Sequence, residues 1–201
     1  MIRLLIADDQ TLVRSALAAL LALEDDFTVV AQVGRGDEVV DAATINQPDV
    51  ALLDIEMPGL DGIAAAAALR AAVPTCAVLI VTTFGRAGFL RRAMEAGALG
   101  FVVKDAPAEQ LANAIRRVAD GERVVDPELA AATLAGGPSP LTPRERDVLT
   151  AARNGATVAD IAKTTFLSEG TVRNYLSSAI TKIGARNRTE AAHEANERGW
   201  L

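Results

Sequence analysis

The first 120 residues alternate short runs of β-branched and other apolar residues with longer stretches of helical character. Continuous apolar runs are typical of strands covered on both faces, and strands separated by helices form a parallel sheet through right-handed crossovers. The expected strands are Ile2–Ala7, Thr28–Val33, Asp49–Leu53, Ala77–Thr82 and Leu99–Val103, and the expected helices are 11–23, 37–46, 62–72, 86–96 and 107–119. We therefore predict an α/β domain with five parallel strands and helices on both faces of the sheet.

The β pattern disappears beyond this segment, and helix signals take its place. The run Gly136–Pro140 is typical of a linker, and a short helix over 127–135 precedes it. N-capping serine and threonine residues, and the capping box Thr142-Pro-Arg-Glu145, predict four further helices. Their ranges are 142–153, 157–164, 169–183 and about 189–199. We expect one domain over 1–120, a linker over 121–140 and an all-α four-helix domain over 141–201.

The net charge of −6 by itself argues against nucleic acid as a partner. However, residues 1–137 carry 11 Lys and Arg against 19 Asp and Glu, whereas residues 138–201 carry 9 against 7. Only the C-terminal part is therefore a candidate for contact with phosphates. The single cysteine, Cys76, excludes an internal disulfide, and the N-terminus lacks the features of a signal peptide. Because no apolar stretch is long enough for a membrane span, we expect a cytoplasmic protein without membrane insertion.

Residues that suit phosphate chemistry stand at the carboxyl ends of four expected strands. Asp8 and Asp9 follow the first strand, Asp54 follows the third, Thr82 ends the fourth and Lys104 follows the fifth. In a parallel α/β sheet these ends meet at one crevice, where ligands bind. Three carboxylates make an oxygen site suited to Mg²⁺, and a lysine and a hydroxyl can hold a phosphoryl group. Any one of these residues could be a solvated strand end, but together they favour phosphoryl transfer to a carboxylate.

These motifs, in this order, resemble the receiver domains of two-component systems over about residues 1–120. The matching stretches are Ala7-Asp8-Asp9, Asp54-Ile-Glu-Met-Pro58-Gly59, Val81-Thr82 and Val103-Lys104. The resemblance implies a flavodoxin-like (βα)5 fold in which a partner histidine kinase phosphorylates Asp54. It also implies that Asp9 and Asp54 bind Mg²⁺ directly, together with the backbone carbonyl of Glu56, while Asp8 acts largely through water.

The same resemblance implies that Lys104 pairs with the phosphoryl group and that Thr82 forms a hydrogen bond to it. Phe101 matches the aromatic switch position of the last strand, although a core phenylalanine would give the same pattern. We also expect a long-lived aspartyl phosphate, because Thr83 and Phe84 would hinder an attacking water. Such a receiver catalyses its own modification, and we do not expect an enzyme in the usual sense.

The expected helices 157–164 and 169–183 are joined by a short turn, as a helix-turn-helix motif requires. In the second helix apolar residues recur every four positions, which seats one face on a core and leaves a polar face free. Arginine and asparagine make bidentate contacts with guanine and adenine edges in the major groove. The candidate DNA-contacting residues are Ser168, Thr171, Arg173, Asn174, Ser177, Lys182 and Arg186. We predict that Arg173 and Asn174 read bases while Lys182 and Arg186 hold the backbone; a small protein-interaction domain is the alternative.

Residues 141–192 resemble the LuxR-type DNA-binding domain of the NarL/FixJ family. The matching stretches are Leu141-Thr-Pro-Arg-Glu145, Asp160-Ile-Ala162, Ser168-Glu-Gly-Thr-Val172, Ile180-Thr-Lys-Ile183 and Asn187-Arg188. Stretches around Thr83 and Gly170 also look like the DesR subgroup of that family. One departure is Thr165, where the family usually has leucine, and we expect Phe166 to fill the missing core volume. The resemblance implies a transcription regulator that binds double-stranded promoter DNA.

The segment 11–23 carries two apolar stripes, one more than a surface helix needs. The first stripe is Leu12, Ala16, Ala19 and Leu23, and the second is Val13, Leu17, Leu20 and Leu21. We expect a homodimer on phosphorylation, with the second stripe as the interface and helix 107–119 beside it. An unusually buried helix would explain two stripes equally well.

Two rival functions are compatible with parts of the sequence. A phosphatase of the haloacid dehalogenase type also forms an aspartyl phosphate, but it needs an aspartate two positions after the nucleophile, where this chain has Glu56. Such an enzyme would also leave the DNA-binding segment unexplained. A phosphorylation-independent regulator with a vestigial receiver is disfavoured by the complete set of acidic, hydroxyl and lysine residues at the strand ends.

Overall fold

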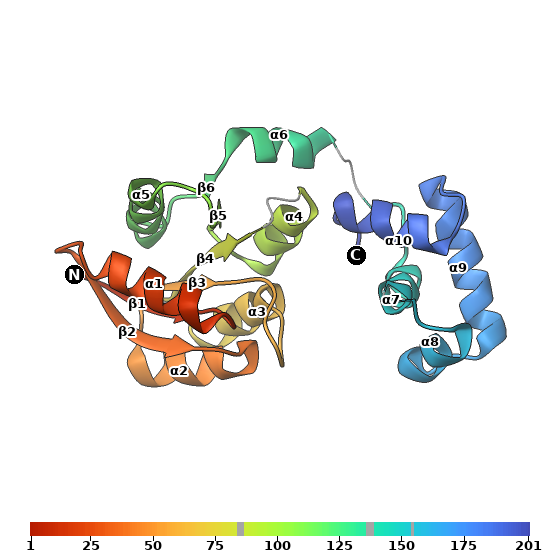
Figure 1. Cartoon of the computed structure of the whole chain (residues 1–201), viewed down its shortest axis with the longest axis horizontal. Helices are drawn as coiled ribbons and strands as arrows, with labels where there is room; N and C mark the ends of the chain where they lie inside the picture. Colours follow the sequence, from red (N-terminus) through yellow and green to blue (C-terminus); the bar gives the residue numbers. More distant parts are fainter. Residues whose placement is uncertain (84–86, 136–138, 154) are drawn as a thin grey trace. The chain divides into compact units, whose positions relative to one another are not determined.

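The computed structural model describes residues 1–83, 87–135, 139–153 and 155–201. It separates into two compact units, the first built almost entirely from residues up to Leu129 and the second mostly from residues beyond it. Figure 1 draws the sheet of the first unit and the helices of the second. Phe84, to which we assigned a role in slowing hydrolysis, and the linker residues 136–138 lie outside the described residues.

Six parallel strands form one sheet in the first unit, in the order β2-β1-β3-β4-β5-β6. The strands are β1 Ile2–Ala7, β2 Phe27–Val33, β3 Val50–Leu53, β4 Ala77–Thr82, β5 Gly100–Val103 and β6 Val124–Val125. The predicted parallel α/β fold is confirmed, with one strand more than expected. Two residues are too few to show a strand pattern, so β6 was hidden in the predicted linker. It joins the sheet edge as the Val124 backbone N–H donates to the Leu99 carbonyl oxygen at 2.9 Å.

Helices cover both faces of this sheet (Figure 1). They are α1 Thr11–Leu21, the 3-10 turn η1 Gly36–Glu38, α2 Val39–Asn46, α3 Gly62–Ala72, α4 Ala87–Ala96 and α5 Ala108–Ala119. A further helix, α6 Pro127–Ala135, follows β6. One core cluster joins α1 and α5 to alternate residues of the strands, such as Leu4, Leu52 and Leu79. Because successive strand residues point to opposite faces, the remaining buried strand residues face the other helices.

The burial of the side chains on α1 bears on the predicted dimer interface. Leu21 is completely buried, and Leu17 and Leu20 pack against the same core. Val13 is half-buried. The stripe assigned to the interface is therefore largely the face that α1 lays on the sheet, because a helix in an α/β unit must bury one apolar stripe. The other stripe is the exposed one, with Leu12 at 82% and Leu23 at 83% exposure.

The four helices predicted beyond the linker are present within the described residues 139–153 and 155–201: α7 Pro143–Ala152, α8 Val158–Thr165, α9 Glu169–Ile183 and α10 Arg188–Glu197. The predicted capping box is present, with the Thr142 hydroxyl accepting from the Glu145 N–H and the Glu145 carboxylate accepting from the Thr142 N–H. Ser168 caps α9, and the side chain of Asn187 caps α10. The apolar face of α9, including Val172, packs in the core of this unit.

Phe166 does not fill core volume, contrary to our expectation. Its side chain is 95% exposed, and its backbone has φ 57° at the C-cap of α8. This left-handed turn directs the chain from α8 into α9, and it is Leu167 that packs against the core. The Thr165 hydroxyl donates to the Ile161 carbonyl oxygen at 2.6 Å. This hydrogen bond satisfies the hydroxyl group at a position where the family usually has leucine.

No helix among the described residues is both long enough and apolar enough to cross a membrane.

Candidate functional site

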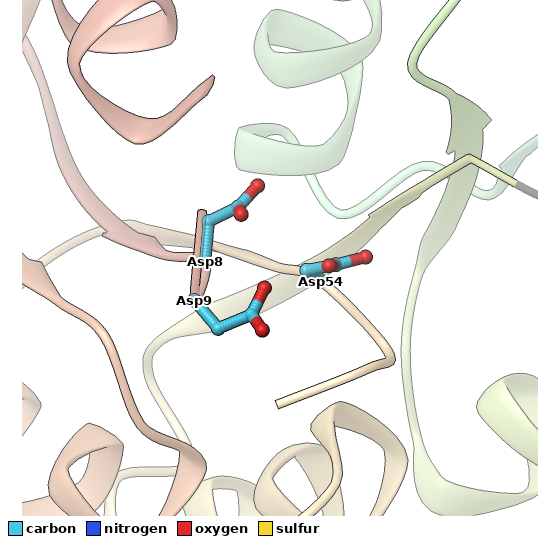
Figure 2. Close-up of side chains that lie close together, drawn as sticks. All are labelled: Asp8, Asp9 and Asp54. Carbon is cyan, nitrogen blue, oxygen red and sulfur yellow. The ribbon is translucent and has the colours of Figure 1, made fainter. Parts of the chain in front are cut away.

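The ends of β1 and β3 bring three acidic residues together. The two strands are neighbours, and the Asp54 N–H donates to the Ala7 carbonyl oxygen at 2.9 Å. Figure 2 shows the side chains of Asp8, Asp9 and Asp54 close together, and one carboxylate oxygen of each lies within 4.8 Å of the others. Asp8 and Asp54 are buried, whereas Asp9 is exposed. The predicted convergence of these carboxylates is therefore present.

Lys104 links two of the carboxylates. Its Nζ lies 2.8 Å from an oxygen of Asp8 and 3.0 Å from an oxygen of Asp54. Burial would lower the pKa of Lys104, but the two carboxylates outweigh burial and raise it. The pKa of Asp54 is raised because burial outweighs the opposing effect of Lys104. The ammonium thus stays charged, in contact with the carboxylate that is the candidate nucleophile.

The residues present fit a divalent cation. Three carboxylates and one ammonium leave a surplus of negative charge when all four are ionised. Carboxylate oxygens are the ligands that Mg²⁺ takes from proteins, and Mg²⁺ keeps several waters of its own. The exposed Asp9 leaves one side of the cluster open to solvent, as such waters require.

The turn after β3 depends on a glycine. The Ile55 N–H donates to Asp54 Oδ1 at 2.8 Å, and the Gly62 N–H donates to the Ile55 carbonyl oxygen at 2.9 Å. A Cβ on Gly62 would lie 1.8 Å from the Asp54 carbonyl oxygen, so only glycine allows α3 to start there. Glu56, whose carbonyl we expect to bind Mg²⁺, has an exposed side chain in this turn.

Asp8 is held from two sides. Its Oδ1 accepts from the Gln10 N–H at 2.9 Å, and its backbone carbonyl accepts from the guanidinium of Arg14 on α1. The role of Arg14 was missed by sequence reasoning, since it is one polar residue on a helix of two apolar stripes. Its place one turn into the helix that follows the acidic pair was the only available signal.

Thr82 and Phe101 are both buried, at 2% exposure. Thr82 ends β4, and its carbonyl oxygen accepts from the Lys104 N–H at 2.7 Å. The sheet register thus brings Thr82 beside Lys104, as predicted. Phe101 lies on β5 between Ile80 and Val125 of the neighbouring strands, and it borders a cleft of about 740 Å³ formed with α5 and the start of α6.

Helix α9 exposes most of the predicted DNA-contacting residues. Arg173, Asn174 and Ser177 are exposed, and Arg173 pairs with Glu169 one turn away at 2.6 Å. Ser168 sits at the N-cap, where its Oγ accepts from the Thr171 N–H and lies 2.8 Å from the Thr171 hydroxyl. The N-terminal part of the helix therefore carries a continuous polar surface.

The two predicted phosphate ligands differ from each other. Arg186 is 86% exposed and pairs with Glu190 on the surface. Lys182 instead donates to Glu145 at 2.7 Å, and Glu145 is buried. Sequence reasoning recognised Glu145 as part of a capping box and missed this second contact, because the lysine lies 37 residues further along the chain.

Comparisons with known proteins agree with both halves of this description. A model of the response regulator receiver domain matches residues 4–116, and a model of bacterial regulatory proteins of the luxR family matches residues 139–195. The chain is 45% identical to the uncharacterized transcriptional regulatory protein YvfU of Bacillus subtilis over 201 residues, which cover 100% of both chains. It is 44% identical to the transcriptional regulatory protein DesR of the same organism, again over 100% of both chains.

Among solved structures, the chain is similar to the response regulator ChrA of a heme-sensing two-component system. The identity is 34% and the TM-score 0.59, with 100% of this chain and 98% of that chain covered. These similarities run along the whole chain and confirm both resemblances inferred from the motifs. The chain therefore belongs to the NarL/LuxR family of two-component response regulators, with a receiver domain followed by a LuxR-type DNA-binding domain.

Proposed function

We propose that this response regulator accepts a phosphoryl group on Asp54 from a sensor histidine kinase, and that the phosphorylated protein dimerises and binds promoter DNA through α9. The observation that carries the proposal is the setting of Asp54. It is a buried carboxylate at the end of β3, with the ammonium of Lys104 at 3.0 Å and two further carboxylates beside it.

In the transfer, one Asp54 oxygen forms a bond to the phosphorus of the kinase phosphohistidine while the P–N bond breaks. The imidazole leaves with the electron pair of that bond and takes up a proton. Lys104 would pair with the phosphoryl oxygens, and Thr82 would form a hydrogen bond to them. Catalysis of this kind is mainly positioning and charge neutralisation, so the protein needs no further acid or base.

Asp8, Asp9, Asp54 and the backbone carbonyl of Glu56 are the groups that we expect to hold Mg²⁺. The bound ion would supply neutralisation of the negative charge on the phosphoryl oxygens. The surplus of carboxylates over lysine at the site supports this assignment. Arg14 and Gln10 keep Asp8 oriented toward the cluster.

The response to phosphorylation is expected to involve Thr82 and Phe101. A hydrogen bond from Thr82 to the phosphoryl group would draw the end of β4 toward the site. The cleft beside Phe101 gives its ring a place into which it can rotate. For the homodimer, the exposed stripe of α1 replaces the buried one as the expected interface, and α5 packs on the same face of the sheet.

The expected DNA interface is the N-terminal half of α9. Arg173 and Asn174 are exposed residues of the types that read guanine and adenine, and Ser168, Thr171 and Ser177 adjoin them. The surface ion pair of Arg173 with Glu169 is cheap to open, because exposed pairs contribute roughly 0–1 kcal/mol. Arg186 is available for a phosphate contact.

Asp54→Asn tests the proposal, since it keeps the shape of the side chain and removes the acceptor. We expect the variant to take up no acid-labile phosphate from acetyl phosphate and Mg²⁺, measured by intact-protein mass. The matched control is Asp41→Asn, an exposed acidic residue on α2, which should be phosphorylated like the wild type. Equal labelling of Asp54→Asn and wild type would show that another residue is the acceptor.

A further inference from the structure

Glu145 is the only acidic side chain that is buried among the described residues of the second unit, at 3% exposure. Both of its carboxylate oxygens are used. Oε1 accepts from the Ser178 hydroxyl at 2.6 Å, and Oε2 accepts from Lys182 Nζ and from the Thr142 N–H, each at 2.7 Å. Burial would raise the pKa of Glu145, but these partners outweigh burial and lower it to about 2. The carboxylate is therefore ionised and fully paired at neutral pH.

These contacts join the N-terminal end of α7 to the C-terminal half of α9. Glu145 lies in the first turn of α7, whereas Lys182 lies in the last turn of α9. A negative charge at a helix N-terminus and a positive charge at a helix C-terminus are each favoured by the helix dipole. Ser178 and Lys182 are four residues apart, so both project from the same side of α9. The start of α7 is thus fastened to two successive turns of α9.

A second row of α9, roughly 100° around the helix axis from Ser178 and Lys182, faces solvent. Arg173, Ser177 and Thr181 follow one another at intervals of four residues, and all three are exposed. Side chains of one helix turn together, so the bonds from Glu145 to Ser178 and Lys182, together with the apolar face packed in the core, fix the rotation of α9 about its axis. That rotation decides the direction in which Arg173 and its neighbours point.

Lys182 is poorly placed for a second task at a DNA phosphate. Its charge is already neutralised by Glu145, and moving the ammonium away would leave a buried carboxylate without its cation, which is strongly unfavourable. Arg186 differs in this respect, because its partner Glu190 is 30% exposed and can be solvated when the pair opens.

We propose that Glu145 and Lys182 form a positioning pair that sets the rotation of α9 for base recognition, and that Lys182 acts through this pair rather than by contacting a phosphate. The inference rests on the proposed function in one respect, namely that α9 is the helix that reads DNA.

The test compares Lys182→Met with Arg186→Met in the full-length protein. The probes are a duplex selected by the wild type from a random library and a scrambled duplex of the same composition, each at several salt concentrations. For Lys182→Met we expect about a tenfold loss of preference for the selected duplex, an unchanged salt slope and a lower thermal midpoint. For Arg186→Met we expect weaker binding to both duplexes, a salt slope smaller by about one unit and an unchanged midpoint.

Three more variants separate a loss of positioning from a general loss of stability. Glu145→Gln can still accept from Ser178 but cannot pair with Lys182 as an anion, so it should lose preference like Lys182→Met. The double variant should be no worse than either single one, because both remove the same interaction. Lys182→Arg should restore the preference. All affinities are measured well below the midpoint of the least stable variant, where circular dichroism shows a folded chain.

The outcomes are distinct. A salt slope reduced by about one unit in Lys182→Met, with preference and midpoint retained, would make Lys182 a phosphate ligand and overturn the positioning pair. Wild-type preference in Glu145→Gln would also overturn it, and this variant decides the matter if Lys182→Met does not fold. If the wild type itself prefers no selected duplex, the proposed function fails first and the inference fails with it.

Discussion

Each unit of this protein pairs a lysine with a buried carboxylate, and the two pairs differ in their charge balance. In the first unit Lys104 pairs with two buried carboxylates and a third carboxylate lies beside them, so negative charge is in surplus. In the second unit Lys182 faces one buried carboxylate whose two oxygens are both paired. A surplus of negative charge allows the first site to bind a cation and a phosphoryl group. The second site is neutral and its carboxylate oxygens are already paired, so it has no charge left with which to bind a ligand. The same two residue types thus serve ligand binding in one unit and helix positioning in the other.

The two sites also differ in the structural elements that supply their charged side chains. The surplus site is built at strand ends, where the topology of a parallel sheet crowds loops together. The balanced pair is built at helix ends, where the helix dipoles favour the charges that are present. Crowding carboxylates costs stability, so we expect the first site to be strained by its charges and the second to be stabilised by them. Three experiments sharpen or break this contrast, and a fourth provides a reference outside both sites.

The largest effect is expected for Lys182→Met. Without Lys182 the buried Glu145 carboxylate loses its cation, which costs at most about 3–5 kcal/mol, the range for fully buried pairs, because Lys182 itself is 35% exposed. Urea unfolding followed by the fluorescence of Trp200, the only tryptophan in the chain and a core residue of the second unit, measures this loss. Arg186→Met is the control and should change the free energy of unfolding by no more than about 1 kcal/mol. Equal effects of the two variants would contradict the contrast.

Acid should act on the second unit through Glu145. Its pKa of about 2 lies below the ordinary 4.5, so its ionised form stabilises the fold above pH 4.5 and this contribution is lost as the pH falls toward 2. The loss should reach roughly 3 kcal/mol, from about 1.4 kcal/mol per pKa unit. Wild type and Glu145→Gln are compared by Trp200 fluorescence across this range, and their difference in stability should shrink as the pH falls. A difference independent of pH would remove Glu145 from the explanation.

The first site should respond with the opposite sign when its charge is reduced. Asp9→Asn reduces the surplus charge and leaves both ion pairs of Lys104, with Asp8 and with Asp54, in place. We expect the first unit to gain about 1 kcal/mol without divalent cations and to bind Mg²⁺ more weakly. Urea unfolding followed by circular dichroism and Mg²⁺ titration measure the two effects, with Asp41→Asn as the control. A loss of stability without Mg²⁺ would show that the site is not strained by charge.

The smallest effect is expected at Phe166, which belongs to neither site. Its left-handed backbone is unfavourable for a bulky residue, and its exposed ring contributes little burial. Asparagine tolerates this conformation, so Phe166→Asn should stabilise the second unit by about 0.5 kcal/mol in urea unfolding. A clear destabilisation would mean that the ring packs against something, and Phe166→Leu, which keeps apolar bulk, would then retain wild-type stability.

Sequence reasoning succeeded where topology settles the position of a residue. Strand ends on the same edge of a parallel sheet must meet, so Asp8, Asp54 and Lys104 were predicted together and lie together. The prediction from sequence failed where one pattern is compatible with two structures. The two stripes of α1 are both apolar, and their sequence does not tell which one faces the sheet; the structure buries Leu21 and exposes Leu12.

The sequence by itself determined the strand and helix order, the receiver and LuxR-type resemblances and the acidic cluster, because these follow from local periodicity and chain topology. Only the tertiary structure decided which charges are buried. The capping boxes Thr142–Glu145 and Thr157–Asp160 have the same form, yet Glu145 is buried against α9 while Asp160 is exposed. Burial is set by what packs over a residue from elsewhere in the chain, and that information lies in contacts between helices rather than in the motif.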